Sequence, residues 1–469
     1  MRTNWWRNPA LRSGLLVGGT LLVAVVGQVA MPPAPRPAPT VVVPISSLAL
    51  ACPALPAGAA GLAVSVRAGL LGNGSGATAD VQSSAPQHAA VPTNGVVTIP
   101  VRRPGAALVA AQGQAAPQLV ADASLIGTTA TTAGYAEYAC QAPSASQWLV
   151  GGSSVVGRTS VLNIANIDDT PATVDVDVWS EQGKSAARSL QGIAIPPRSV
   201  KAIALALVDP GRAVYAVHVM AASGQVTSAI VDRGQHALAS LGIDVIEPFA
   251  QPLASGLVGI VPGGSRGATL ALLSPGVPTA VHVSLVTSDG TYPLAGAENL
   301  TLDADRVLRV PIPDAAVTGD VAVLVQADTP VIAGVAESLA LRGGSDIASE
   351  PFMAPIYRNA SFTVDAGVSR ATLLLHSDIA VDATVIDAVG ARRTTTTVHV
   401  RPGVVTRLRV VNGRGRTHLI SVLPGTDGVV RGSVLFEAAS AGMDATSVAP
   451  LLGVRGYVAV PPVAPDVSR

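Results

Sequence analysis

"NIANIDDTPATVDVDVWSEQG", residues 163–183, has the pattern of two short β-strands joined by a turn. From Val174 to Val178 valine alternates with aspartate, and a period of two places apolar side chains on one face of a strand and polar ones on the other. Similar stretches return as "LLSPGVPTAVHVSLVTSDG" at 272–290 and "LLHSDIAVDATVIDAVG" at 374–390. We therefore interpret the stretch as the first hairpin of a unit that is repeated along the chain.

The repeated unit has the size of a whole domain. The glycines that end the three stretches, Gly183, Gly290 and Gly390, are 107 and 100 residues apart. The junctions between units also recur, as "IEPFAQPL" at 246–253, "SEPFMAPI" at 349–356 and a weaker "VAPLL" at 448–452. We count six or seven short alternating strands in each unit, which is typical of a two-sheet antiparallel sandwich of immunoglobulin type.

The composition agrees with an all-β protein. Hydrophobic residues make up 49% of the 469 residues but aromatic residues only 3%, and the 47 glycines and 36 prolines favour many short strands joined by turns. The 30 basic residues balance the 30 acidic ones, so no overall field would attract nucleic acid, and we expect no nucleic-acid partner. A β-propeller of eight blades is the alternative architecture, because about 50 residues form one blade.

The N-terminus predicts export. Arg2, Arg7 and Arg12 precede an apolar run at 13–31, and no acidic residue occurs before Asp80. Such a run is close to the minimum that spans a bilayer, and the basic flank keeps the N-terminus in the cytoplasm. We expect a single-pass anchor in the plasma membrane with the C-terminal part outside. The alternative is a cleaved signal peptide and secretion. A Pro-rich segment follows and predicts an extended spacer.

The sequence thus predicts tandem immunoglobulin-like antiparallel β-sandwich domains after one N-terminal transmembrane helix. The predicted parts are a basic cytoplasmic tail (1–12), an anchor or signal (13–31), a Pro-rich linker (32–47), a first, less regular β domain (48–143), three sandwiches (144–248, 249–351 and 352–440) and a C-terminal junction and tail (441–469).

Cys52 and Cys140 are the only cysteines. In an oxidising compartment an even pair is most simply one disulfide, which closes a long loop and contributes about 3–5 kcal/mol. Two unrelated buried thiols are the alternative.

A resemblance to a known family rests on Cys52-Pro53 and on "YACQAPSASQWLVGGSSVVGRTSVLNIAN" at 138–166. These stretches resemble an uncharacterised family of exported, membrane-anchored actinobacterial proteins. The resemblance covers most of the exported part and implies a setting in the cell envelope. It supplies no catalytic residues.

We expect no catalytic, metal or cofactor site. "GGSRG" at 263–267 fits the G-x-S-x-G pattern of a hydrolase, but that motif needs a following helix, and "ATLALLSP" reads as a strand. The histidines lack metal-ligand spacing. Asp168 and Asp169 allow calcium as a weaker alternative. Trp148 and Trp179, the two tryptophans of the exported part, lie where packing is the simpler role than sugar stacking.

One charged segment stands out. Residues 391–426 hold seven arginines and no acidic residue. Either they form a solvated strand face, or they contact an anionic polymer of the envelope. The candidate contact residues are Arg407, Arg409, Arg414 and Arg416. The main prediction is a non-catalytic, membrane-anchored scaffold or interaction protein of the bacterial envelope with protein partners, and the alternative is a surface module that binds an anionic or glycan polymer.

Overall fold

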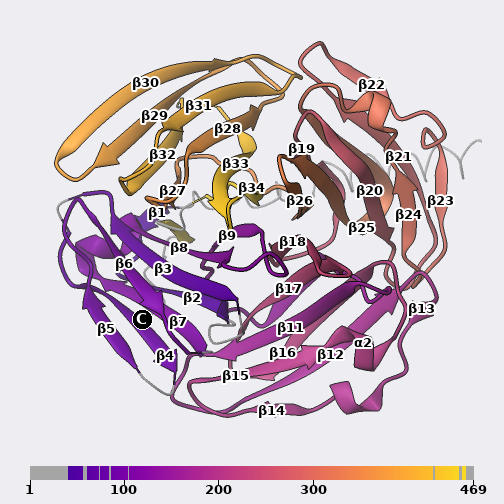
Figure 1. Cartoon of the computed structure of the whole chain (residues 1–469), viewed down its shortest axis with the longest axis horizontal. Helices are drawn as coiled ribbons and strands as arrows, with labels where there is room; N and C mark the ends of the chain where they lie inside the picture. Colours follow the sequence, from indigo (N-terminus) through magenta and orange to yellow (C-terminus); the bar gives the residue numbers. More distant parts are fainter. Residues whose placement is uncertain are drawn as a thin grey trace, which may run out of the picture. The chain divides into compact units, whose positions relative to one another are not determined.

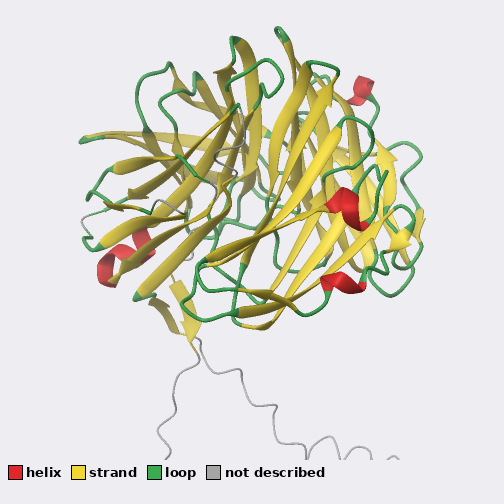
Figure 2. Cartoon of the chain, turned by 60° about the horizontal axis from the view of Figure 1, so that its bottom comes forward, coloured by secondary structure: helices red, strands yellow, loops and turns green. Residues whose placement is uncertain are grey.

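Strands form nearly all of the regular structure, and the helices are short turns between them (Figure 2). The computed structural model describes residues 41–55, 61–72, 74–83, 86–103, 105–425, 428–453 and 457–460. The chain divides into two compact units. In one, β1 (Val41–Pro44) pairs antiparallel with β35 (Tyr457–Val460). The other, Ile45–Gly456, contains everything that follows here.

In the described part of Ile45–Gly456, a pattern of eight strand positions occurs four times, and we call these copies 1 to 4. Copy 1 contains β2 (Ser47–Leu55), β3 (Leu62–Leu70), β4 (Ala77–Ser83), β5 (Gln87–Ala90), β6 (Val96–Val101), β7 (Gly105–Gln112), the 3-10 helix η2 (Gly113–Gln118), β8 (Leu119–Gly127) and β9 (Tyr135–Ala139). Copy 2 contains β10 (Ser146–Gly151), β11 (Arg158–Asn166), β12 (Ala172–Ser180), β13 (Gly183–Lys184), η3 (Arg188–Leu190), β14 (Ile193–Ile195), β15 (Ser199–Ala204), α2 (Leu205–Val208), β16 (Tyr215–Ser223), β17 (Thr227–His236) and β18 (Ala239–Ile246).

Copies 3 and 4 follow the same order. Copy 3 contains β19 (Leu253–Val261), β20 (Ser265–Leu273), β21 (Thr279–Val286), β22 (Thr291–Pro293), β23 (Leu300–Leu302), β24 (Leu308–Pro311), η4 (Asp314–Ala316), β25 (Val321–Leu341) and β26 (Gly344–Pro351). Copy 4 contains β27 (Ala360–Val364), β28 (Arg370–His376), β29 (Val381–Val389), β30 (Arg392–Val400), β31 (Thr406–Asn412), β32 (His418–Pro424), β33 (Arg431–Ser440) and β34 (Met443–Pro450).

Each copy consists of two antiparallel sheets with interleaved strands. In copy 2 the sheets run β10-β16-β12-β13 and β15-β11-β17-β18, and copies 1 and 4 repeat this order with β2-β7-β4-β5 and β6-β3-β8-β9, and with β27-β32-β29-β30 and β31-β28-β33-β34. In copy 3 the long strand β25 fills the sixth and seventh positions and serves both sheets, because its first half pairs with β19 and β21 and its second half with β20 and β26. The fourth position is divided between β13 and β14 in copy 2, and between β22 and β23 in copy 3. These sheets are not the eight blades of the alternative propeller, because the strands of each sheet are interleaved along the chain with those of the other sheet in the same copy.

The core of each copy lies between its two sheets. In copy 2 the alternating residues Val174, Val176 and Val178 of β12 are buried against Leu162 and Ile164 of β11, as the period of two in the sequence requires. The other copies have corresponding clusters of valine, leucine and alanine. The fold is therefore all-β and sandwich-like. The domain limits predicted from the sequence stay predictions.

The copies contact one another through shared apolar clusters and through their last strands. Ala229 and Ile243 of copy 2 join the core of copy 1, Trp148 and Ala271 belong to a cluster between copies 2 and 3, and further clusters join copies 3 and 4 and copies 4 and 1. The last strands β9, β18, β26 and β34 contact each other at the centre of the view in Figure 1. Several buried acidic groups lie on these strands, among them Glu137, Asp244 and Asp346.

The predicted anchor at 13–31 and the start of the linker lie outside the described residues. Within the described ranges, the structure contains no helix with the length and apolar character to cross a membrane.

Candidate functional site

The four last strands are joined by one carboxyl group, that of Asp346 on β26. Its Oδ1 accepts hydrogen bonds from the backbone N–H groups of Ile243 on β18 at 3.0 Å and of Ile347 at 3.1 Å. Its Oδ2 accepts from Tyr135 on β9 at 2.9 Å and Thr446 on β34 at 3.1 Å. A single buried side chain thus satisfies backbone donors from all four copies.

The backbone comes close to Asp346 because glycine stands beside it. Gly242 has a φ of +118° and a Cβ there would collide with Asp346 Oδ1, so only glycine allows β18 to pass at this distance. Burial raises the pKa of Asp346 to about 7, against the four backbone hydrogen bonds that favour its charged form. Burial likewise raises the pKa of the neighbouring Glu350 to about 7.

The repeated junction motif places one buried carboxyl group in each of copies 2 and 3. Glu247 of "IEPFAQPL" accepts from the backbone N–H of Ala139 in copy 1 at 2.6 Å. Glu350 of "SEPFMAPI" accepts from the N–H of Ile260 at 2.7 Å. The sequence showed that the junctions recur but not that their acids are buried hydrogen-bond acceptors.

A buried arginine joins copy 1 to copy 4. The Arg67 side chain has no exposed surface, forms an ion pair with Glu137, and contacts Asp365 Oδ2 with its Nη1 at 3.2 Å. Its Nε donates to Thr363 Oγ1 at 3.0 Å, and Thr363 in turn donates to Asp122 at 2.8 Å. Burial lowers the pKa of Arg67, but the surrounding acidic groups, Glu137 first, outweigh this and raise it above its usual value.

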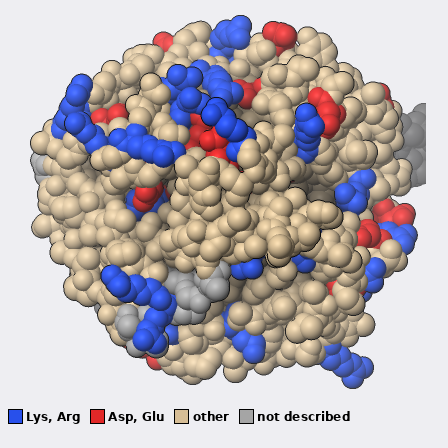
Figure 3. Space-filling model, in the orientation of Figure 1, with Lys and Arg blue, Asp and Glu red and all other residues tan. Residues whose placement is uncertain are grey.

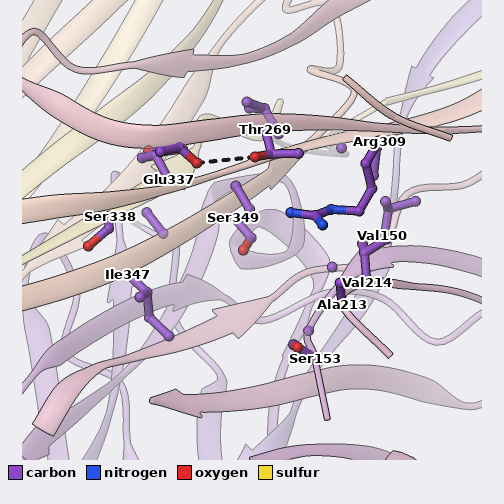
Figure 4. Close-up of a pocket in the computed structure, with 18 of the residues that line it drawn as sticks. Val150, Ser153, Ala213, Val214, Thr269, Arg309, Glu337, Ser338, Ile347 and Ser349 are labelled. Carbon is purple, nitrogen blue, oxygen red and sulfur yellow. Dashed lines mark hydrogen bonds between the residues drawn. The ribbon is translucent and has the colours of Figure 1, made fainter. Parts of the chain in front are cut away.

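A cleft of about 420 Å³ opens between copies 2 and 3. Its walls come from β10, β20 and the second half of β25, and Figure 4 shows Arg309 of β24 extending into it toward Ser349. Arg158, Arg266 and Arg309 line the cleft, and Val150 and Ala271 are among its apolar residues. The cleft thus combines arginine side chains with an apolar wall.

The predicted arginine patch lies on copy 4. Arg407 and Arg409 are exposed on β31, and Arg414 and Arg416 are exposed in the turn before β32. Basic side chains gather over this part of the molecule in Figure 3, where Figure 1 shows β28 to β31. Arg407 Nη1 contacts Asp320 of copy 3 at 2.8 Å, so this arginine already has an acidic partner. Whether the patch contacts a polymer stays a prediction.

Cys52 and Cys140 form a disulfide with a Cα–Cα distance of 4.4 Å. The disulfide connects β2 to the end of β9, and both cysteines are buried in the core of copy 1. Beside it the backbones of Ala51 and Gln141 exchange two hydrogen bonds, of 2.8 and 2.9 Å.

The remaining motifs have structural roles. Ser265 of "GGSRG" begins strand β20, with no helix after it. Asp169 forms an ion pair with Arg198, and among the described residues no group of three histidines, cysteines or acids could hold a metal ion. Trp148 and Trp179 are stacked at 5.5 Å and buried between copies 2 and 3, so they present no open face to a sugar.

The sequence analysis identified neither the cleft nor the three arginines that line it, Arg158, Arg266 and Arg309. The buried acid Glu337 of β25 gave no signal either, because an acid within a strand usually marks a solvated face. The cleft exists only where two copies meet.

The observations define a class, an all-β protein of repeated sandwich-like copies joined at a polar centre. The chain belongs to the family described as "family of unknown function (DUF5719)", whose model matches residues 96–411. No curated protein matches. Among solved structures, an anti-sigma factor domain-containing protein from Clostridium clariflavum is similar at 8% identity and a TM-score of 0.13, over 82% of this chain and 100% of that one.

Proposed function

We propose that the protein is a non-catalytic scaffold or interaction protein of the bacterial cell envelope, held to the membrane by its N-terminal segment. The observation that carries the proposal is the contact of Asp346 with backbone donors of all four copies. Because buried hydrogen bonds in a low dielectric are costly to break, the exposed faces of the copies keep constant mutual positions. Constant spacing of several surfaces is what a scaffold needs in order to hold partners together.

Two features support a place outside the cytoplasm. The basic flank and the apolar run at 13–31 have the pattern of an anchor or signal, and the Cys52–Cys140 disulfide fits an oxidising compartment. The proposal includes the actinobacterial origin that the resemblance implied and the immunoglobulin-like assignment of each copy. The latter is supported by pairing of the second strand position with the fifth and of the third position with the sixth, as β11 pairs with β15 and β12 with β16.

The topology is tested by adding protease to intact cells from which the wall has been removed. The bulk of the chain should be digested, and full protection would contradict the proposal. Cross-linking in the native envelope followed by purification of the full chain tests the scaffold role. We expect the wild-type chain to recover the same defined proteins each time. A variant that separates the copies should lose these proteins. Recovery of no specific protein would overturn it.

The second candidate is a surface module for an anionic polymer. It rests on the exposed Arg409, Arg414 and Arg416 of copy 4. Recovery of anionic polymer rather than protein in the same purification would favour this candidate.

A further inference from the structure

The fourth strand position is the edge of one sheet in every copy, and three of the copies keep it short. Copy 1 has the four residues of β5 there, and copies 2 and 3 divide the position into pieces of two or three residues. Short or interrupted edge strands protect a sheet against pairing with other chains. Copy 4 lacks this protection, because β30 is one unbroken strand of nine residues, on the outer side of the copy in Figure 1.

The pairing of β30 leaves one of its two backbone edges free. In the described part of the chain, β30 pairs with no strand other than β29. The backbone oxygen of Asp382 in β29 accepts from Gly425, on the side of β32, at 3.0 Å. Because successive residues of a strand direct their backbone groups to alternate sides, the odd-numbered residues of β29 face β30, and each stands opposite an even-numbered residue there. The residues of β30 whose backbone N–H and C=O groups point away from the sheet are therefore Arg393, Thr395, Thr397 and His399.

The free edge belongs to a segment that is extended by its own composition. Residues 392–397 are exposed on both faces of the strand, and the last four of them are threonines. Threonine is β-branched and favours an extended backbone. Val398 and Val400 of the same strand are buried in the core of copy 4. The core thus fixes one end of β30, and the threonine segment continues from it with an accessible backbone.

The charge around β30 selects the strand that it accepts. Arg392 and Arg393 belong to β30, and residues 391–426 contain seven arginines and no acidic residue. The acids of β29 are already engaged, since Asp382 and Asp387 each contact a histidine, at 2.7 and 2.9 Å. A second copy of this chain would bring the same excess of arginine to the contact and be repelled. An acidic strand would be attracted.

We propose that the free edge of β30 docks an extended acidic segment of a partner protein, which joins the sheet β27-β32-β29-β30 as a fifth strand. Backbone hydrogen bonds to Thr395, Thr397 and His399 hold the segment, and its acidic side chains lie near the arginines at the start of β30. Copy 1 bounds the site at that end, because the Arg393 side chain donates to the backbone oxygen of Leu71 at 3.1 Å. The proposal rests on the interaction role given above and names the kind of partner.

The probe is a labelled peptide with the sequence of β29, VDATVIDAV, added to the full-length purified chain. This sequence suits β30, because the two strands pair along their whole length in the folded protein, and it carries two aspartates. The control peptide has asparagine at both positions. Fluorescence anisotropy at low salt should show the acidic peptide binding at least three times more tightly, with the difference shrinking as salt rises. Absence of binding, or equal binding of both peptides, would overturn the proposal.

Methylation of the peptide backbone tests whether the peptide binds as a strand. A strand added to a sheet donates hydrogen bonds from only one of its own edges. One modified peptide carries N-methyl groups at the positions of Thr384 and Ile386, and the other at those of Ala383 and Val385, which lie on the opposite edge. Exactly one of the two should lose binding. Loss by both, or retention by both, would contradict strand addition.

A proline variant of the full chain locates the site. Thr397→Pro removes one outward N–H and leaves the even-numbered residues that pair with β29 unchanged, so it should keep the wild-type denaturation midpoint and bind the acidic peptide at least tenfold more weakly. Thr397→Ala keeps the N–H and is the matched control, with wild-type binding. Equal binding by both variants would place the peptide elsewhere. If Thr397→Pro lowers the midpoint, the two methylated peptides still decide the question.

Two further outcomes separate this proposal from its alternatives. Light scattering should show that the wild-type chain and Thr397→Pro have the same mass in solution. A dimer that Thr397→Pro converts to a monomer would mean that β30 pairs with a second copy, which overturns the acidic partner. Failure of the peptide to bind, together with recovery of defined proteins by cross-linking, would refute this site and leave the scaffold role standing.

Discussion

Asp346 Oδ2 accepts a hydrogen bond from the backbone N–H of Tyr135 at 2.9 Å, although 211 residues separate the two in the chain. The bond joins copy 3 to copy 1, and the same carboxyl group also reaches copies 2 and 4. The contacts that join the four copies therefore include one side chain, Asp346, and replacing it tests how much it contributes to stability.

Asp346→Asn should destabilise the protein strongly. The amide keeps one acceptor oxygen, but its NH₂ group would face two buried N–H donors and leave them unsatisfied. Each such donor costs about 1–3 kcal/mol, so we expect a loss on the order of 2–5 kcal/mol in the free energy of unfolding. Denaturant unfolding at pH 8 measures it. Asp303→Asn, at an exposed position, is the matched control and should change stability by less than about 0.5 kcal/mol. Equal stability of the two variants would contradict the role given to Asp346.

Stability should fall as the pH rises from 5 to 8. Asp346 and Glu350 have pKa values of about 7 in the folded protein, above the value near 4 expected in the unfolded chain. In this window the folded state binds more protons than the unfolded state, so the stability contribution is complete below about pH 4 and is lost as the pH passes 7. Each group contributes on the order of a few kcal/mol.

Denaturant midpoints at pH 5, 6, 7 and 8 check this dependence. Glu350→Gln, which no longer titrates, should flatten the profile. A midpoint that rises with pH would mean that the carboxyl groups at the centre are ionised throughout.

Replacement of both Cys52 and Cys140 by alanine should lower the free energy of unfolding by about 3–5 kcal/mol, because the closed loop is long. Thiol labelling of the non-reduced wild-type protein should find no free cysteine. Two reactive thiols, or an unchanged stability of the double variant, would exclude the disulfide as a stabilising element.

Replacement of Arg409, Arg414 and Arg416 by glutamine tests the arginine patch without breaking the Arg407–Asp320 pair. If the patch binds anionic polymer, retention on polyglucuronate should be lost at low salt, and wild-type retention should weaken as salt rises. The matched control replaces three exposed arginines of the other copies, Arg102, Arg188 and Arg342. Both triple variants should keep wild-type stability. If the two are retained equally, the patch is only a solvated face.

Much of the fold was predictable from local pattern. The alternation from Val174 to Val178 predicted a half-buried strand, and β12 has that burial pattern. The register shift between Arg266 and Thr269 was not predictable, because Arg266 stands in the same local pattern as Arg158 and Arg370. The sequences of two neighbouring strands do not by themselves specify the register in which the strands pair.

By itself, the sequence determined the strands, the repeat and the presence of a single cysteine pair. These follow from periods of two and of about a hundred residues and from residue counts, which are local or compositional signals. Only the tertiary structure decided that Asp346 meets Tyr135, Ile243 and Thr446, and that the carboxyl group of Glu337 is buried without a hydrogen-bond partner. The physical reason is that an acidic residue in a strand is compatible with water or with burial, and the choice depends on which distant backbone donors the packed copies bring to it.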